Sequence, residues 1–166
     1  SWQKKIFKNQ NIMKTKLVQI FLLLFIVACN QDSPNIKQIS NMQYFIDNEI
    51  QEGIYSVEPG LQYSIIQSGD QSTESPLLED TITAHFHGTL TDGSVFWSSI
   101  EMGEPLTVQL SGLIVGCQKI ISMMKTGDEW RVYIDPSMAY GDEGRPGIPS
   151  NSILIFDIEL LDIKKS

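Results

Sequence analysis

Residues 139–161, AYGDEGRPGIPSNSILIFDIELL, join three local features that decide the fold. Tyr140 and the glycine after it begin a turn, a loop rich in glycine and proline follows, and the segment ends in an alternation of apolar and polar residues. The two prolines restrict their own backbone, and the alternation is typical of a strand with one buried face. An aromatic turn, a flap and a buried strand in this order can form one wall of an apolar pocket.

The same alternation predicts most of the other strands. In residues 81–90 the apolar side chains fall on one face, which predicts that Phe86 points inward. Asp92-Gly93 is a hairpin signal between this strand and the next. The stretches predicted to be strands are 61–65, 81–90, 95–97, 106–110, 129–135 and 152–163.

Two stretches have helical spacing instead. Between Gly112 and Gly127 one apolar stripe is formed by Cys117, Ile120, Ile121 and Met124. Residues 41–57 are predicted to hold a short leading helix, with Ser40 or Asn41 as its cap. These elements predict an α+β fold, in which a bent antiparallel half-barrel sheet wraps on one central helix.

Charge excludes one class of function. The chain has 166 residues, with 12 basic and 20 acidic side chains and a formal net charge of −8. The first 28 residues contain five lysines and no acid, so the rest carries a formal charge of −13. Nucleic-acid binding needs a positive surface that displaces counterions, so no nucleic-acid partner is expected.

The N-terminal region has the pattern of a targeting segment. An apolar run at 17–28 follows Met13-Lys14-Thr15-Lys16 and is shorter than the 20 or so residues of a membrane span. Small Ala28 precedes Cys29, which resembles a bacterial lipobox, although a plain secretory signal with an incidental cysteine is the alternative. Residues 1–28 are thus expected to be upstream residues and a lipoprotein signal peptide, with Met13 as the start. Residues 29–40 are expected to be a polar tether from a lipid-bearing Cys29.

Several motifs together resemble the FKBP-type peptidyl-prolyl cis-trans isomerases. HFHGTLTDGSVF from His85, PLTVQL from Pro105, LIVGC from Leu113 and the AYG…FDIELL segment match in order and spacing, over roughly residues 60–163. The short gap between Leu110 and Leu113 resembles the Mip-like envelope branch, without that branch's long dimerisation arm. The resemblance makes 58–166 the isomerase domain. It implies proline-containing polypeptide clients and no cofactor. The missing arm leads us to expect a monomer, and the lipobox leads us to expect a protein of the bacterial cell envelope that is lipid-anchored through Cys29.

The resemblance also assigns a proline-binding site residue by residue. It implies catalytic roles for Tyr140, Phe96 and Phe156. It implies substrate contact for Phe86, Trp97, Leu106, Leu113, Ile114, Cys117 and Ile148. Leu106 and Leu113 replace an aromatic residue and a valine of the family, and Arg145 stands at a flap position that is often histidine.

Three site positions depart from the family pattern. Phe86 stands for a tyrosine, Trp97 for an aspartate and Cys117 for the tryptophan of the pocket floor. The tyrosine and aspartate of the family form a hydrogen bond with each other. Losing only one of them would leave a buried polar group unpaired, at a cost of about 1–3 kcal/mol, whereas losing both leaves none unpaired. Gaining an indole at Trp97 while losing one at Cys117 keeps the volume about constant, and we expect Trp97 to fill part of the space above Cys117.

Two functions follow from this mixed site. The first is an isomerase that helps envelope proteins fold, with activity weakened by the three departures. The second is a non-catalytic FKBP-fold module that binds peptides as a chaperone or assembly part. The intact flap and Tyr140 favour the first, and the departures favour the second.

Simpler roles compete with functional ones at a few positions. His85 and His87 share a strand face, but two imidazoles without a third ligand make a poor metal site, so a solvated face is expected. Cys117 lies on an apolar helix stripe, which favours core packing over a nucleophile. Tyr140 and Phe156 are also compatible with plain core packing.

Overall fold

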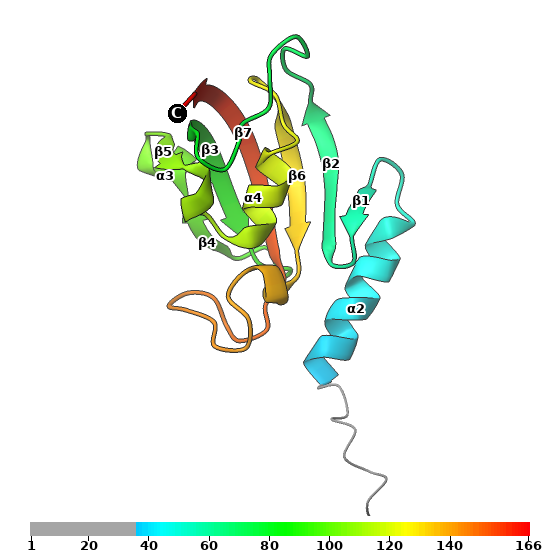
Figure 1. Ribbon diagram of the computed structural model, residues 1–166. Coiled ribbons are helices and arrows are strands. Elements are labelled where there is room, and N and C mark those ends of the chain that lie inside the picture. Colours follow the sequence, from blue (N-terminus) through cyan, green and yellow to red (C-terminus); the bar gives the residue numbers. More distant parts are fainter. Residues whose placement is uncertain (1–35) are drawn as a thin grey trace, which may run out of the picture. The chain divides into compact units, whose positions relative to one another are not determined.

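An antiparallel sheet of seven strands is the centre of the structure, a computed structural model that describes residues 36–166 (Figure 1). The order is β1-β2-β6-β7-β3-β4, and β5 pairs with β3 off this path. The long strand of the deciding segment therefore lies in the middle of the sheet. The strands are β1 Tyr55–Glu58, β2 Leu61–Gln67, β3 Thr81–Thr89, β4 Val95–Ser98, β5 Leu106–Gln109, β6 Glu129–Ile134 and β7 Leu154–Lys164.

Helix α4, Val115–Ile121, lies over one face of the sheet and closes the core (Figure 1). A Cβ on Gly116 would come within 2.4 Å of Cγ2 of Ile134, so only glycine lets the helix approach β6 this closely. Ile120 and Ile121, in the last turn of the helix, are fully buried in the core. Because burying such a side chain stabilises the fold by roughly 1.5–3 kcal/mol, this contact is a main source of stability.

The predicted fold class is confirmed. Strand β3 alternates between partly buried and buried positions along its whole length, and Phe86 points inward with 2% of its surface exposed. The predicted helix at 112–127 is shorter than its apolar pattern, because the helix ends at Ile121. Met124 is still fully buried, but it lies in the turns that follow the helix.

Helix α2, Ile36–Glu49, begins earlier than predicted and overlaps the last five residues of the expected tether. The predicted cap at Ser40 or Asn41 is wrong, because both residues lie inside the helix, and the side-chain Nδ2 of Asn41 donates to the carbonyl of Asn151 at 3.0 Å. The side chain of Asn41 therefore serves a tertiary contact and does not cap the helix. Strand β1 was not predicted, because its four residues are mostly exposed and its pairing with β2 contains a bulge.

Short helical turns connect the strands near the site. Ser98 caps helix α3, Ser99–Met102, and the hydroxyl of Ser99 accepts a hydrogen bond from the Phe86 N–H at 2.9 Å. The other two turns are η1, Leu110–Gly112, and η2, Pro136–Met138. Within residues 36–166, no helix is long and apolar enough to cross a membrane. The expected signal peptide and Cys29 lie outside the described residues.

Residues 36–166 form a compact unit with a hydrophobic core of its own. The core residues come from the sheet, from α4 and from the loops between them. A unit with its own complete core can fold by itself. This range is therefore suitable for experiments on the isolated domain.

Candidate active site

One cavity of about 470 Å³ brings together all ten residues that the sequence assigned to the site. They come from four strands, from α4 and the two residues that precede it, and from the loop between β6 and β7. They are Phe86, Phe96, Trp97, Leu106, Leu113, Ile114, Cys117, Tyr140, Ile148 and Phe156. Ile114 is the N-cap residue of α4, so the cavity lies at the N-terminal end of that helix.

Phe156 of β7 organises the aromatic wall. Its ring meets Phe96 edge to face at 5.4 Å between centroids, and it meets Phe86 edge to face at 6.3 Å. A Cβ on Gly88 of β3 would lie 2.6 Å from Phe96 and 2.9 Å from Phe156, so glycine makes room for both rings. Sequence reasoning did not assign Gly88 to the site. A lone glycine inside a strand was the signal, since such a residue often marks close approach by a neighbour.

The three departures from the family pattern all line this cavity. Phe86 and Trp97 contact each other with centroids 6.1 Å apart, so two rings meet where the resemblance implies a hydroxyl and a carboxylate. Cys117 is 2% exposed. Burial raises the pKa of the Cys117 thiol to about 12, so it stays protonated at neutral pH and packs as a small apolar group.

The flap is fixed by a tight turn at Pro146-Gly147. The N–H of Arg145 donates to the carbonyl of Ile148 at 2.9 Å, and the N–H of Ile148 donates back at 2.8 Å. Gly147 has a φ of +84°, which the third residue of a type II turn requires and which favours glycine. The turn holds Ile148 against the cavity with 5% of its surface exposed.

Arg145 contacts the hydroxyl of Tyr140 across the flap. Its Nη1 donates to the Tyr140 Oη at 2.8 Å, and its guanidinium carbon lies 4.8 Å from the centroid of the tyrosine ring. Arg145 is the one charged side chain among the described residues that line the cavity. The sequence placed it on the flap but did not assign it to the site, because neither contact is visible in the residue pattern.

The two histidines face away from this cavity. The Nδ1 of His85 lies 3.0 Å from the hydroxyl of Ser99, and the Nδ1 of His87 lies 3.0 Å from that of Ser98. Residues 36–166 contain no cluster of three or more histidine, cysteine or acidic side chains that could hold a metal ion. The cavity is an apolar, aromatic site with one hydroxyl at its rim.

Known proteins share both the sequence pattern and the fold. The family model described as FKBP-type peptidyl-prolyl cis-trans isomerase matches residues 72–161, which is more than half of the chain. The chain therefore belongs to the family of FKBP-type peptidyl-prolyl cis-trans isomerases.

The curated relatives of the chain include two proteins named Mip. Peptidyl-prolyl cis-trans isomerase Mip of Coxiella burnetii is 40% identical over 119 residues, which are 71% of this chain and 51% of that protein. The outer membrane protein MIP of Legionella longbeachae is 38% identical over 120 residues, or 72% of this chain and 51% of that protein. The chain thus spans about half the length of these curated relatives.

A solved structure agrees with the fold over most of the chain. The crystal structure of FkpA from Escherichia coli aligns with a TM-score of 0.72 and 30% identity, and it covers 96% of this chain and 71% of that one. The two relatives named Mip are consistent with the predicted similarity to the Mip-like branch.

Proposed function

We propose that this protein is a peptidyl-prolyl cis-trans isomerase that assists the folding of envelope proteins. The observation that carries the proposal is the cavity, where aromatic walls around Phe156 face a flap that holds the Tyr140 hydroxyl. Tyr140, Phe96 and Phe156 are the proposed catalytic residues, and the other seven bind the proline and its neighbours. The proposed substrates are proline-containing polypeptides, and the reaction needs no cofactor.

The chemistry asks little of the protein beyond shape and electrostatics. Rotation about an Xaa-Pro amide has a barrier of roughly 18–20 kcal/mol, because amide resonance must be broken. The two isomers differ by only about 0.5–1 kcal/mol. A pocket poor in water favours the twisted amide over the planar one, because the planar form has the larger charge separation. An apolar cavity can therefore lower the barrier without forming a covalent bond.

Tyr140 supplies the polar contact in this proposal. Its oxygen accepts a hydrogen bond from Arg145, so its own hydrogen stays available for a carbonyl of the substrate. The hydrogen bond that the hydroxyl accepts from Arg145 polarises its O–H group, and this strengthens the hydrogen bond that the hydroxyl donates. Arg145 thus acts through Tyr140 as a positioning residue. Ile114, at the N-terminal end of α4, offers backbone contact to the peptide, as the family resemblance implies.

The exchanges at Phe86, Trp97 and Cys117 predict weakened catalysis. The aspartate missing at Trp97 removes one polar contribution of about 1–3 kcal/mol, which corresponds to roughly 5–150-fold in rate. Peptide binding without catalysis remains the second candidate, and the contact between Phe86 and Trp97 is the observation that favours it.

A protease-free assay on a short Xaa-Pro peptide with residues 36–166 tests the enzyme. We expect catalysis above the spontaneous rate, a loss of about tenfold in kcat/KM for Tyr140→Phe, and a gain for the triple variant Phe86→Tyr/Trp97→Asp/Cys117→Trp, which restores the aspartate together with its tyrosine partner. Catalysis by the triple variant alone, with none by the natural domain, would show that the protein binds peptides without isomerising them.

We also propose that the protein is a monomer, lipid-anchored in the cell envelope through Cys29. The small residue before Cys29 and the basic and apolar run ahead of it support this location, as does the similarity to a protein named as an outer membrane protein. Mass spectrometry of the native protein should find cleavage before Cys29 and acyl chains on that cysteine. An intact chain through this position would contradict the anchor.

A further inference from the structure

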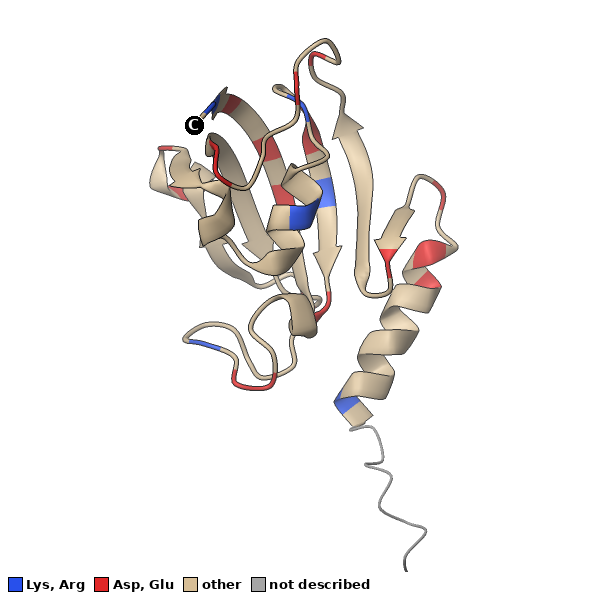
Figure 2. Cartoon of the chain, viewed as in Figure 1, with Lys and Arg blue, Asp and Glu red and all other residues tan. Residues whose placement is uncertain are grey.

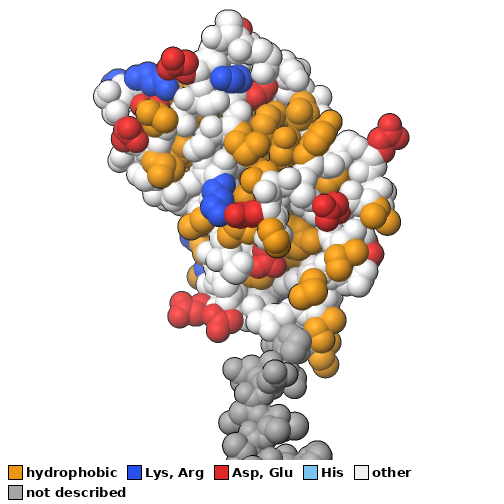
Figure 3. Space-filling view, turned by 45° about the vertical axis from the view of Figure 1, so that its right-hand side comes forward, with side chains coloured by type: hydrophobic (Ala, Val, Ile, Leu, Met, Phe, Trp, Pro, Cys, Tyr) orange, Lys and Arg blue, Asp and Glu red, His pale blue; other side chains and the backbone are white. Residues whose placement is uncertain are grey.

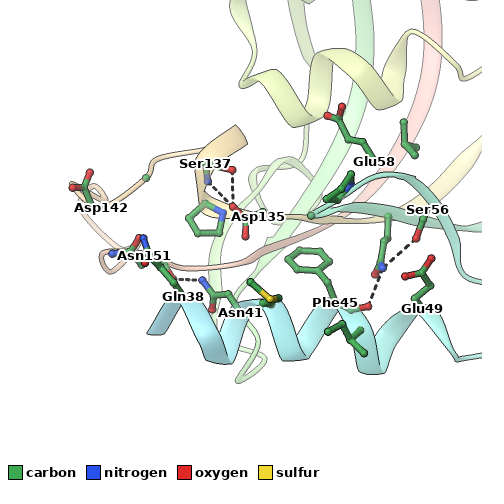
Figure 4. A pocket seen from close by; sticks show the side chains of 18 residues that line it. Gln38, Asn41, Phe45, Glu49, Ser56, Glu58, Asp135, Ser137, Asp142 and Asn151 are labelled. Atoms are coloured by element: carbon green, nitrogen blue, oxygen red, sulfur yellow. Dashed lines mark hydrogen bonds between the residues drawn. The ribbon is translucent and has the colours of Figure 1, made fainter. Parts of the chain in front are cut away.

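A second, larger hollow lies beside helix α2, apart from the isomerase cavity. It has a volume of about 820 Å³ and runs between α2, the β1–β2 hairpin and the loop after β6 (Figure 4). We call it the α2 groove. Its apolar side chains are Met42, Phe45, Ile46, Val57, Pro59 and Pro136. None of these residues belongs to the proposed catalytic site.

Hydrogen bonds hold α2 beside the sheet and leave the groove open. Asn41 donates to the carbonyl of Asn151 at 3.0 Å, and the amide of Gln62 donates to the carbonyl of Phe45 at 2.9 Å (Figure 4). Asn41 and Gln62 are 6% and 2% exposed, so both anchors are shielded from water. The groove is therefore part of the folded structure and does not need a ligand to form.

The floor of the groove exposes apolar surface that a partner would cover. Met42 is 62% exposed, Ile46 is 51% exposed and Val57 is 39% exposed. Figure 3 shows hydrophobic side chains exposed at several places on the side of the molecule that carries α2 in Figure 1. Contiguous apolar surface with a polar border marks interaction sites on soluble domains.

The border of the groove is acidic, which selects the partner. Four carboxylates line it, Glu49, Glu58, Asp135 and Asp142, and among its described lining residues there is no lysine or arginine. Figure 2 shows acidic positions at the end of α2, at the β1–β2 turn and on the loop after β6. Glu58 pairs with Lys119, which lies outside the groove. A basic partner is favoured, whereas a second copy of this chain would bring the same carboxylates into contact with them.

The length and place of the groove fit an extended peptide. Gln38 and Glu49 line its two ends on α2, about 16 Å apart at the helical rise, which is the length of about five residues of extended chain. Gly141 lines the groove, and its neighbour Tyr140 lines the isomerase cavity. A polypeptide held in the groove therefore has its continuing chain close to the site where a prolyl bond would isomerise.

We propose that the α2 groove binds an extended client segment in which apolar residues alternate with lysine or arginine. The proposal rests on the isomerase function in one respect, since the groove would raise the effective concentration of prolyl bonds at the cavity. Only clients long enough to reach both sites benefit. Short peptides are processed by the cavity alone.

Three peptides with one Ala-Leu-Pro-Phe core test this on residues 36–166. The first has no arm, and the others carry a Gly-Ser spacer with either a Leu-Lys-Leu-Lys-Leu or a Leu-Glu-Leu-Glu-Leu arm. We expect kcat/KM about tenfold higher for the basic arm than for the acidic arm or the bare core, since each exposed charge contact contributes a few-fold. The advantage should shrink when salt is raised from about 0.05 M to about 0.5 M.

The double variant Glu49→Lys/Asp142→Lys should abolish the advantage and leave the bare core within twofold of the natural domain. Lysine at Glu49 suits the last turn of α2, because a cation stabilises a helix C-terminus. Glu52→Lys/Glu79→Lys makes the same charge change at exposed positions outside both cavities and should keep the advantage. An unchanged advantage in the groove variant, or an equal one with the acidic arm, overturns the proposal.

Direct binding separates this proposal from the isomerase itself. Fluorescence anisotropy of the labelled basic arm should show binding to the natural domain and to the control, and its loss in the groove variant, even if no peptide is isomerised. Binding to residues 36–166 that disappears in the full chain would instead show that the chain's own basic, apolar residues 14–28 occupy the groove. A dimer in sedimentation that Ile46→Glu dissociates would make the groove an interface between copies.

Discussion

The two sides of the isomerase cavity are built by different means. The flap side keeps Tyr140 and Ile148 as the resemblance implies them and depends on the backbone, since the turn at Gly147 fixes where Ile148 and Arg145 lie. The other side, which we call the rebuilt side, has Phe86, Trp97 and Cys117 where the family has other residues, and it depends on side-chain volume. We expect its exchanges to compensate each other, because Phe86 and Trp97 meet as rings where the resemblance implies a polar pair, and the indole at Trp97 accompanies the loss of one at Cys117.

This difference separates what a pocket needs for its shape from what it needs for its chemistry. Close packing tolerates exchanges that conserve volume, so an apolar wall can be rebuilt at small cost in stability. Few residues can replace a glycine at a positive φ, and few side chains can replace a hydroxyl that both accepts and donates a hydrogen bond. The flap side should therefore determine activity, and the rebuilt side should determine stability and the degree of activity.

Phe156 gives the largest expected effect, because it joins both sides. Phe156→Ala removes a ring that contacts Phe86 and Phe96, and it should lower the free energy of unfolding by about 3–5 kcal/mol. Urea denaturation measures the loss, and kcat/KM for a short prolyl peptide should fall more than tenfold under folding conditions.

Phe45→Ala is the matched control. Phe45 is also 6% exposed, but it lines the α2 groove instead of the isomerase cavity. Its loss should lower stability and leave the activity on short peptides unchanged. Equal losses of activity in both variants would mean that Phe156 affects catalysis only by stabilising the fold.

How far the sequence predicts the structure depends on whether a feature is local. The alternation around Ile82, Ala84 and Phe86 predicts β3, because a buried face imposes a period of two on the chain itself. Strand β1 lacks this signal, since its exposed residues gain their pairing only from β2. The predicted start of α2 at residue 41 is wrong, because the side chain of Asn41 binds Asn151, far away in the chain, and does not cap the helix.

The site follows the same division. Ten of the lining residues could be predicted from a match to a family, because the spacing of its motifs survives in the sequence even where residue types differ. Gly88 and Arg145 could not be assigned in this way, since their roles depend on distances to Phe96 and Tyr140. The α2 groove has no local signal at all, because it is formed by segments that meet only in the folded chain.

The rebuilt side should also make stability depend on alkaline pH. Burial raises the pKa of the Cys117 thiol to about 12, whereas an exposed thiol in the unfolded chain ionises at about 8.5. Between these values the unfolded state binds fewer protons than the folded state, so stability falls as pH rises, by about 2 kcal/mol between pH 8 and pH 10.

Cys117→Ala isolates this effect. The pKa values of Tyr44 and Tyr63 are also raised, mainly by desolvation, and they contribute to the alkaline loss in both proteins. The difference in slope between the natural domain and the variant, from urea denaturation at each pH, therefore reports the thiol alone. Identical slopes would mean that Cys117 is open to solvent.

Trp97 tests whether volume is conserved on the rebuilt side. Trp97→Ala should lower the free energy of unfolding by about 1–2 kcal/mol, less than for a fully buried ring because Trp97 is only half-buried. Peptide affinity, measured by fluorescence anisotropy, should also fall. Trp97→Phe keeps much of the volume and should lose less of both. No change in either measurement for Trp97→Ala would show that its indole does not fill the space above Cys117.

Arg145 gives the smallest expected effect and tests the flap side. Arg145→Ala removes the hydrogen bond and the ring contact to Tyr140 at an exposed site, so kcat/KM should fall by about 2–5-fold. Arg145→Lys keeps the charge without the planar group and should recover only part of the loss. If Arg145 acts through the tyrosine hydroxyl, Arg145→Ala should have little further effect in a Tyr140→Phe background. Additive losses would instead mean that Arg145 contacts the substrate directly, because independent interactions add and coupled ones do not.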